Sequence, residues 1–453
     1  MNKLWMLLIC IVFVACQKEV KKDYALFSGK VIGNADEVRI FGNDFEYKIP
    51  IAEDGTFSDT LKIDVEGYYD YNIGKEYSAI YLTKGADLNL TIDTSQFDES
   101  IAYTGVGSGE NNFLAEKYLK IEEMTADMKA FFSLEPEAYK KKSKALKNEI
   151  QNLLDSKREL NVDFVQSETL SNTYTHVGRL FDYEGGHKYY TKKEELELPE
   201  DFFVEAKEID FTDENKYQTL PQYKNLVRGY LQRSLSDLEK KYDDDTPKAL
   251  QELVGGMPAD SKIKEAFLQN MSFYMAYSDK LDQLYAVLKT TPNQEHQKEF
   301  ERQYKIYKTL VKGKPSPSFE YENFKGGSTA LGDLKGKYVY MDIWATWCGP
   351  CKKEIPFLKK LEENYHNKNI EFVSISIDRK KDYDAWKQMV EDKELGGIQL
   401  IADKDWKSDF VMNYGIKGIP RFILVDPEGK IVSANAPRPS NPKLIDLFDE
   451  LEI

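Results

Sequence analysis

An apolar strand candidate runs into a pair of cysteines in the stretch Tyr338-Val339-Tyr340-Met341-Asp342-Ile343-Trp344-Ala345-Thr346-Trp347-Cys348-Gly349-Pro350-Cys351. If a helix begins at Cys348, Cys351 follows almost one turn later, so the two sulfurs can form and break a disulfide with little strain. The unpaired N–H groups and partial positive charge at a helix N-terminus stabilise a thiolate there. The pattern therefore predicts a redox pair in which Cys348 attacks a disulfide and the less exposed Cys351 resolves the mixed disulfide.

A zinc site is the other common use of a Cys-x-x-Cys spacing, and it requires two further ligands. The remaining cysteines, Cys10 and Cys16, lie within the first sixteen residues, and no two of the four histidines are four residues apart. A zinc site is therefore disfavoured. We expect no metal and no cofactor beyond the Cys348–Cys351 disulfide itself.

Strands and helices alternate on both sides of the cysteine pair. Residues 370–376 and 422–425 are strand candidates with helical stretches between them, and the linker 313–318 is rich in proline, glycine and serine. This order predicts βαβ units in a mixed sheet over 313–453.

Residues 342–354 and 414–420 resemble thioredoxin and, within that superfamily, the exported TlpA/ResA-like thiol-disulfide oxidoreductases. The resemblance covers 314–453. It implies that Pro420 is cis and faces the disulfide, and that backbone groups of Ile419 are free to pair with a substrate chain as an added strand. The substrate-binding residues that follow from it are Trp347, Gly349, Pro350, Ile419, Pro420 and Arg421.

Two acids join the catalytic candidates. Asp342 interrupts an apolar strand, so its pKa is expected to be raised by burial, and it matches the thioredoxin aspartate that relays protons to the second cysteine. Glu354 follows Cys351 by three residues on the same side of the helix and matches an acid of the TlpA/ResA-like group. The alternative for Glu354 is an ordinary surface charge beside two lysines.

Arg421 departs from the family pattern, in which threonine usually follows the cis proline. A cation here would favour the Cys348 thiolate or select acidic partners. Alternatively, the side chain points away from the site. The residues alone leave both readings open.

The chain begins with one lysine followed by about a dozen apolar residues that end at Ala15-Cys16, which is typical of a lipoprotein signal peptide. Residues 1–15 would be removed, Cys16 would carry the lipid, and 16–24 would form a tether. Phe13, in place of the usual leucine, weakens the match, and an ordinary secretory signal is the alternative. Both readings export the protein to the cell envelope, on the periplasmic face or the surface of the outer membrane.

Two further regions precede the redox region, so we expect a multidomain α+β protein. Residues 25–108 alternate apolar and polar residues, as in Leu61–Val65 and Leu88–Ile92, which predicts a small antiparallel sandwich or barrel resembling a domain of unknown function found before thioredoxin domains. Residues 109–312 show helical periodicity, interrupted by breakers such as Gly185-Gly186, and are expected to form one irregular α-helical domain.

The net charge of −15 at pH 7 disfavours nucleic-acid binding. The leading hypothesis is a lipid-anchored reductase of disulfides in exported client proteins, such as apocytochrome c. By resemblance, a membrane dithiol protein of the DsbD or CcdA type supplies its electrons. The alternatives are a thiol oxidase or isomerase, a thiol peroxidase (whose Pro-x-x-x-Thr-x-x-Cys pattern is missing), and a lipoprotein that binds a partner or glycan and carries a subsidiary redox domain.

Overall fold

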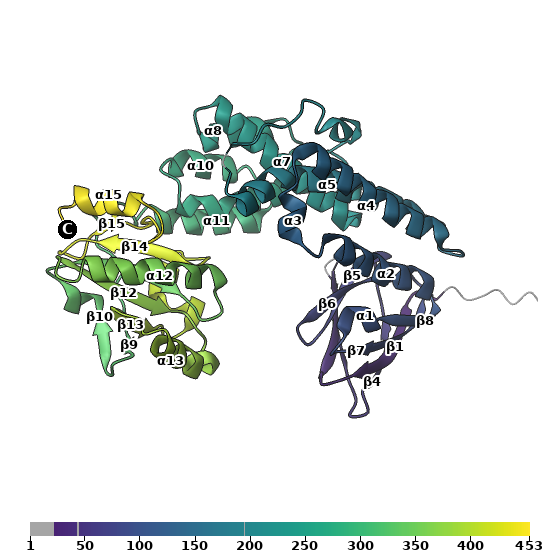
Figure 1. The fold of residues 1–453 in the computed structure, drawn as a ribbon, viewed down its shortest axis with the longest axis horizontal. Coiled ribbons are helices and arrows are strands. Elements are labelled where there is room, and N and C mark those ends of the chain that lie inside the picture. The colour runs from purple at the N-terminus through teal and green to yellow at the C-terminus, as the bar shows by residue number, and fades with distance from the viewer. Residues whose placement is uncertain (1–21, 43–44, 194) are drawn as a thin grey trace, which may run out of the picture. The chain divides into compact units, whose positions relative to one another are not determined.

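The computed structural model describes residues 22–42, 45–193 and 195–453 (Figure 1). The expected signal peptide, the expected lipidation site Cys16 and most of the expected tether lie outside the described residues. The chain divides between Arg233 and Ser234 into two compact units. Each unit is described by itself.

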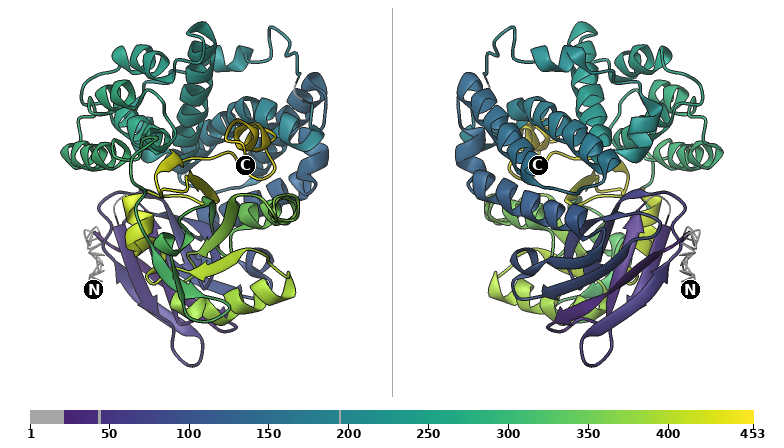
Figure 2. Two further views of the ribbon diagram at one scale, coloured as in Figure 1. Left: turned by 90° about the vertical axis from the view of Figure 1, so that its left-hand side faces the viewer. Right: turned by 90° about the vertical axis from the view of Figure 1, so that its right-hand side faces the viewer.

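The first unit begins with two four-stranded sheets, whose strands are coloured purple to blue in Figure 2. Their orders are β4-β1-β7-β8 and β3-β2-β5-β6. The strands are β1 Ala25–Ile32, β2 Glu37–Gly42, β3 Phe45–Pro50, β4 Thr56–Leu61, β5 Gly67–Ile73, β6 Glu76–Leu82, β7 Asp87–Asp93 and β8 Ala102–Val106. Side chains of both sheets, among them Phe27, Ile40, Tyr71 and Leu90, form one buried core.

The expected antiparallel β domain is confirmed, with two differences in detail. β1 and β7 pair in parallel, so the first sheet is mixed. Leu61 is the last residue of β4, and residues 62–65 are not a strand, although the window Leu61–Val65 alternates apolar and polar residues. Leu88–Ile92 lies within β7 as expected, with Leu88, Leu90 and Ile92 buried.

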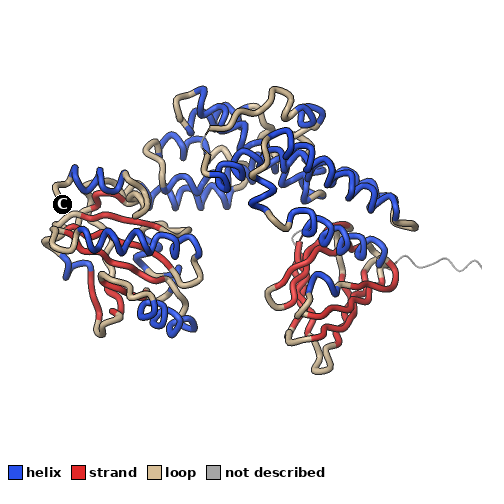
Figure 3. Tube along the Cα trace, in the orientation of Figure 1, coloured by secondary structure: helices blue, strands red, loops and turns tan. Residues whose placement is uncertain are grey.

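Helices follow β8, and Figure 3 shows no strand between β8 and β9 in the described residues. Those of the first unit are α2 Ser108–Thr125, α3 Met128–Phe132, α4 Pro136–Ser156, α5 Val162–Thr191, η1 Val204–Glu208 and α6 Glu214–Thr219, after the short α1 Phe97–Ser100. The boundary between the units falls within α7, Pro221–Lys241.

Gly185 and Gly186 were expected to break a helix, but both lie inside α5. A Cβ atom on Gly186 would fall 2.2 Å from Cδ1 of Phe132. The absent side chain at Gly186 therefore permits a close approach of the aromatic ring to the helix, which is a packing role and not a helix break.

The expected helical middle is confirmed, and the division between the two compact units falls inside it. Its second half, α8 Thr246–Gly255, α9 Lys262–Met271, η2 Ser272–Ala276, α10 Leu281–Leu288 and α11 Gln294–Tyr307, belongs to the compact unit that also holds the redox region. Residues far apart in sequence make the contacts that join these helices to the redox region, so the periodicity of the helices could not indicate this division.

A seven-stranded mixed sheet forms the rest of the second unit, in the order β10-β9-β13-β12-β11-β14-β15. Its strands are β9 Glu320–Asn323, β10 Ser328–Ala330, β11 Tyr338–Trp344, β12 Ile370–Ser376, β13 Ile398–Ile401, β14 Arg421–Val425 and β15 Ile431–Ser433. The helices are α12 Gly349–Asn364, α13 Tyr383–Asp392, α14 Asp409–Asn413 and α15 Lys443–Glu450. β11 lies between β12, to which it is parallel, and β14, to which it is antiparallel, so the sheet is mixed as expected.

One face of the sheet packs against α12 and α15. Tyr340 and Leu424 share a core with Leu358 of α12 and Phe448 of α15. Because side chains alternate along a strand, Asp342 of β11 lies on the same face as Tyr340, toward α12. The helix that carries the cysteines thus covers the buried aspartate.

The described residues include no helix that is both long and apolar enough to cross a membrane.

Candidate active site

Cys348 and Cys351 form a disulfide at the start of α12, with their Cα atoms 5.3 Å apart. Cys348 is the N-cap residue of that helix, and its Sγ accepts a hydrogen bond of 3.1 Å from the backbone N–H of Cys351. A helix N-terminus favours negative charge at this position. Both cysteines are buried, at 4% and 3% exposure, so the expected difference in exposure is absent. The N-cap position, and not exposure, is what distinguishes Cys348 from Cys351.

The peptide bond between Ile419 and Pro420 is cis. Arg421, the first residue of β14, pairs with Ile343 of β11, one residue before the end of that strand. Because the two strands are antiparallel, the cis proline lies at the edge of the sheet where β11 ends and the segment leading to Cys348 begins. Within the described residues, the backbone N–H and C=O of Ile419 form no hydrogen bond.

Asp342 is buried, and its Oδ1 atom has no hydrogen-bond partner among the described residues. Burial, reinforced by the charges of Glu354 and Glu362, raises the pKa of Asp342 to about 8. A carboxyl group with this pKa can hold or release a proton near neutral pH, which suits exchange with a thiol.

Glu354 is buried at 8% exposure, so it is not the surface charge that its lysine neighbours suggested. Its carboxylate accepts hydrogen bonds from the backbone N–H of Ser440, at 3.0 Å, and from the Ser440 hydroxyl, at 2.9 Å. These bonds hold Glu354 against the segment that precedes α15. Sequence reasoning did not find Ser440, because it lies 86 residues further along the chain.

Arg421 is 3% exposed and faces the helices of its own unit. Its Nε donates to the carbonyl of Ala434 at 3.0 Å, and its Nη2 to the carbonyl of Ala276 at 3.4 Å. The guanidinium also lies 4.8 Å from the ring centroid of Tyr277. The guanidinium is thus bonded to main-chain oxygens and packed on an aromatic ring. It is therefore not exposed to an acidic partner.

The remaining substrate-side candidates surround the disulfide. Trp347 is 52% exposed, directly before Cys348, and its ring lies 6.4 Å from that of Trp406. Gly349 and Pro350 are the first residues of α12 and are exposed. Proline at the second helical position leaves no backbone donor unsatisfied, which suits a helix start.

Asp378 positions the segment before Cys348, a role that sequence reasoning missed. It is 1% exposed and accepts hydrogen bonds from the backbone N–H of Thr346, at 2.9 Å, and from its hydroxyl, at 2.7 Å. A further hydrogen bond, of 2.7 Å, comes from the hydroxyl of Ser376. The available signal was an acidic residue two positions after the end of an apolar strand, β12, which runs parallel to β11.

Glu362 is a second missed acid. It lines a small cavity together with Asp342, Ser374 and Gln399. Burial raises the pKa of Glu362 to about 7. The sequence signal for Glu362 was its position about two helical turns after Glu354. This spacing puts both acids on neighbouring parts of one helix surface. No group of His, Cys, Asp and Glu within the described ranges has the arrangement of a metal site.

A disulfide at a helix N-cap, a cis proline at the same sheet edge and a buried acid beneath the helix define a thioredoxin-like dithiol/disulfide protein. The Redoxin family model matches residues 311–447. The chain belongs to the ResA family of thiol-disulfide oxidoreductases, and the residues before this region are additional to it.

Two ResA proteins illustrate the relationship. ResA of Bacillus cereus is 33% identical over 120 residues, which cover 26% of this chain and 66% of that protein. ResA of Bacillus subtilis is 30% identical over 138 residues, covering 28% and 73%. A solution structure from Bacteroides vulgatus, provisionally assigned as a thiol-disulfide oxidoreductase, is 52% identical, with coverage of 32% of this chain and 93% of that one and a TM-score of 0.28.

Proposed function

We propose that this protein is a cell-envelope thiol-disulfide oxidoreductase that reduces disulfides of exported client proteins. The observation that carries the proposal is the Cys348–Cys351 disulfide at the N-terminus of α12, at the same sheet edge as the cis Ile419–Pro420 bond. The relatives named thiol-disulfide oxidoreductases support the reaction class.

The reaction starts from the reduced pair. The Cys348 thiolate attacks one sulfur of a client disulfide, a Cys348–client bond forms, and the other client sulfur leaves as a thiolate and takes up a proton. The Cys351 thiolate then attacks Cys348, the internal disulfide forms, and the second client thiol is released. Two electrons pass to the client.

Asp342 is the proton carrier in this scheme. Cys351 must lose its proton before it can attack, and a buried carboxyl group with a pKa of about 8 can accept a proton in the neutral range. Ile419 contributes its unpaired backbone N–H and C=O to hold the client chain in an extended form beside the cysteines.

The oxidised pair must be reduced again by another dithiol. We propose a membrane dithiol protein of the DsbD or CcdA type as the donor, and anchoring through a lipid on Cys16 after removal of residues 1–15. The sequence pattern at 1–16 supports export and anchoring. Incorporation of labelled fatty acid into the wild-type chain but not into Cys16→Ser tests the anchor.

The reduction potential of the Cys348–Cys351 pair tests the direction of the reaction. The fluorescence of Trp344 and Trp347 in defined thiol buffers reports the redox state of the full chain. A value near or below roughly −230 mV supports a reductase, whereas about −120 to −180 mV would indicate an oxidase or isomerase. Absence of disulfide reduction by the wild-type chain, with Cys348→Ser as the matched control, would refute the proposed function itself.

A further inference from the structure

Three exposed aromatic rings lie together on the segment 273–277, which consists of most of η2 and the residue after it, between α9 and α10. Phe273, Tyr274 and Tyr277 are 45%, 44% and 40% exposed. The ring of Phe273 lies 6.0 Å from that of Tyr274 and 5.1 Å from that of Tyr277. We call these three residues the aromatic patch. Such a group of exposed rings is characteristic of a binding surface.

The aromatic patch contacts the segment that carries the cis proline. A Cβ atom on Gly418 would lie 3.5 Å from Cε2 of Phe273, so the ring rests against the backbone two residues before Pro420. On the other side of Pro420, Arg421 lies 4.8 Å from the ring centroid of Tyr277. The patch thus flanks the cis proline on both sides in sequence.

Contacts from α11 hold the same segment. The Tyr307 hydroxyl donates to the Gly415 carbonyl at 2.9 Å, and Lys417 forms an ion pair of 2.8 Å with Glu299. Gly415 has a φ of 58°, and a Cβ there would fall 2.6 Å from Cε1 of Tyr307, so a glycine is required for this close approach. The helical segment and the cis-proline segment therefore pack directly against each other.

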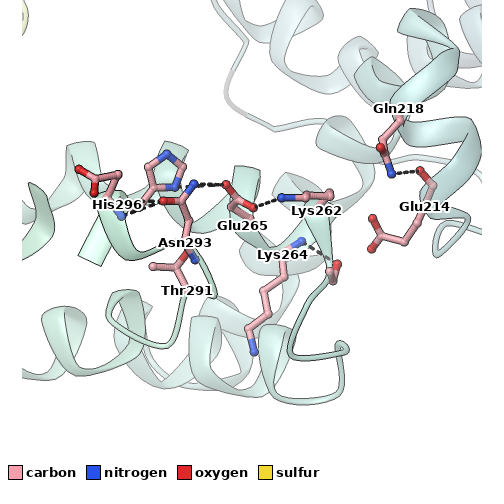
Figure 4. Close-up of polar contacts among 10 residues, drawn as sticks. Glu214, Gln218, Lys262, Lys264, Glu265, Thr291, Asn293 and His296 are labelled. Carbon is pink, nitrogen blue, oxygen red and sulfur yellow. Dashed lines mark hydrogen bonds and ion pairs between the residues drawn. The ribbon is translucent and has the colours of Figure 1, made fainter. Parts of the chain in front are cut away.

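The helix that leads into the aromatic patch is itself fixed by polar contacts. Figure 4 shows Glu265 of α9 between Asn293 and Lys262. Asn293 Nδ2 donates to Glu265 at 2.6 Å, and His296 Nδ1 lies 3.7 Å from the same carboxylate. These contacts join α9 to the start of α11. They therefore fix the position of the helix that precedes the aromatic patch.

We propose that the aromatic patch receives a large apolar side chain that flanks the cysteine of a disulfide-bonded client polypeptide. The proposal rests on the function proposed above and names the class of client segment. A client chain paired with Ile419 runs in extended form along the cis-proline segment, and its side chains alternate in direction. Phe273 of the patch rests against Gly418, the residue before Ile419, which is why an extended polypeptide is the occupant.

The charges around the patch favour an apolar residue over a charged one. Lys417 is paired with Glu299, and Arg421 is buried and bonded to two carbonyl oxygens. Both cations already have partners in the protein, while the rings offer apolar area whose burial is favourable. The second unit thereby adds a selectivity surface that the sheet and α12 alone do not contain.

Two disulfide-bonded peptides test the proposal with the full chain. They are identical except for Phe or Ser two residues before the cysteine that Cys348 attacks. The wild-type chain is expected to prefer the Phe peptide in kcat/KM. Phe273→Ser/Tyr274→Ser is expected to lower kcat/KM for the Phe peptide about tenfold more than for the Ser peptide. Tyr77→Ser, which removes a 62% exposed ring from β6, is the matched control and leaves the preference unchanged.

Equal effects of the double substitution on both peptides, or no effect on either, overturn this proposal. If the wild-type chain still reduces the peptides, the proposed function stands. A loss of self-association in the double variant without a change in peptide preference would instead assign the patch to a second copy of the chain, and also overturns it. Failure of the wild-type chain to reduce either peptide refutes the proposed function and this inference together.

Discussion

The guanidinium of Arg421, directly after the cis proline, lies 4.8 Å from the ring centroid of Tyr277, 144 positions earlier in the chain. A cation over an aromatic ring is favourable, and more so when water is excluded. Two carbonyl oxygens accept hydrogen bonds from the same group. The contact links the redox site to helices that carry none of the reacting sulfurs.

Replacement of Arg421 by threonine, the residue usual in thioredoxins, is expected to lower the free energy of unfolding by about 2 kcal/mol. The loss arises because the partly buried carbonyls of Ala276 and Ala434 lose their donor. Urea unfolding of the oxidised protein measures it. The pH dependence of Cys348 alkylation is expected to stay unchanged, since the guanidinium is engaged elsewhere. A shifted alkylation profile at unchanged stability would contradict this account.

Replacement of Asp342 by asparagine is expected to stabilise the oxidised protein at neutral pH. The pKa of Asp342 is raised from 3.8 to about 8 in the folded state. Between these values the unfolded chain has released the proton and the folded chain retains it, so stability falls as pH rises from about 4 to 8. At pH 7, Asp342→Asn raises the free energy of unfolding by at most ~4 kcal/mol.

Urea unfolding of wild type and Asp342→Asn at pH 4 and pH 8 tests this prediction. The difference between the two proteins should be small at pH 4 and large at pH 8. Asp384→Asn, which changes an exposed aspartate of α13, is the matched control. A stability difference that is constant with pH would show that Asp342 is ionised in the folded state.

The same substitution is expected to slow turnover, because Cys351 loses its proton acceptor. Release of reduced client from the mixed disulfide should slow about 10²-fold near neutral pH, and formation of the mixed disulfide should change little. Stopped-flow fluorescence of the two steps separates them. Unaltered release rates between pH 6 and pH 9 would rule out the proton role.

Substitution of either cysteine should have distinct effects. Cys351→Ser is expected to accumulate a covalent Cys348–client disulfide, because the resolving thiol is absent, whereas Cys348→Ser should form none. Non-reducing electrophoresis with mass spectrometry identifies the adduct. An adduct that forms in the Cys348→Ser variant at the wild-type rate would reverse the assigned order of attack.

Glu354→Gln is expected to destabilise the fold by about 1 kcal/mol, because an amide oxygen accepts the backbone N–H of Ser440 more weakly than a carboxylate does. Ser440→Ala removes only the hydroxyl bond and should cost less. Thermal unfolding compares the two. If Glu354 also transfers protons, only Glu354→Gln shifts the pH profile of kcat/KM. Identical profiles in the two variants would show that Glu354 has a structural role alone.

Local sequence patterns determined the redox centre. The apolar run of β11, the cysteine spacing and the segment around Pro420 each act over a few residues, so their spacing and composition predicted the strand, the helix start and the resemblance. The raised pKa of Asp342 followed from the same reasoning, since a carboxyl group in an apolar strand is buried wherever the strand lies.

Only the tertiary structure decided which distant groups surround that centre. The bonds from Ser440 to Glu354 and from Arg421 to Ala276 span 86 and 145 residues. Periodicity identified helices over 109–312, but not that those after Arg233 pack with the redox region. Contacts of this kind depend on which surfaces meet after the chain has folded, and a single sequence carries no local signal for them. The sequence by itself therefore determined the chemistry of the two sulfurs, and the fold determined the surface presented to a client beside them.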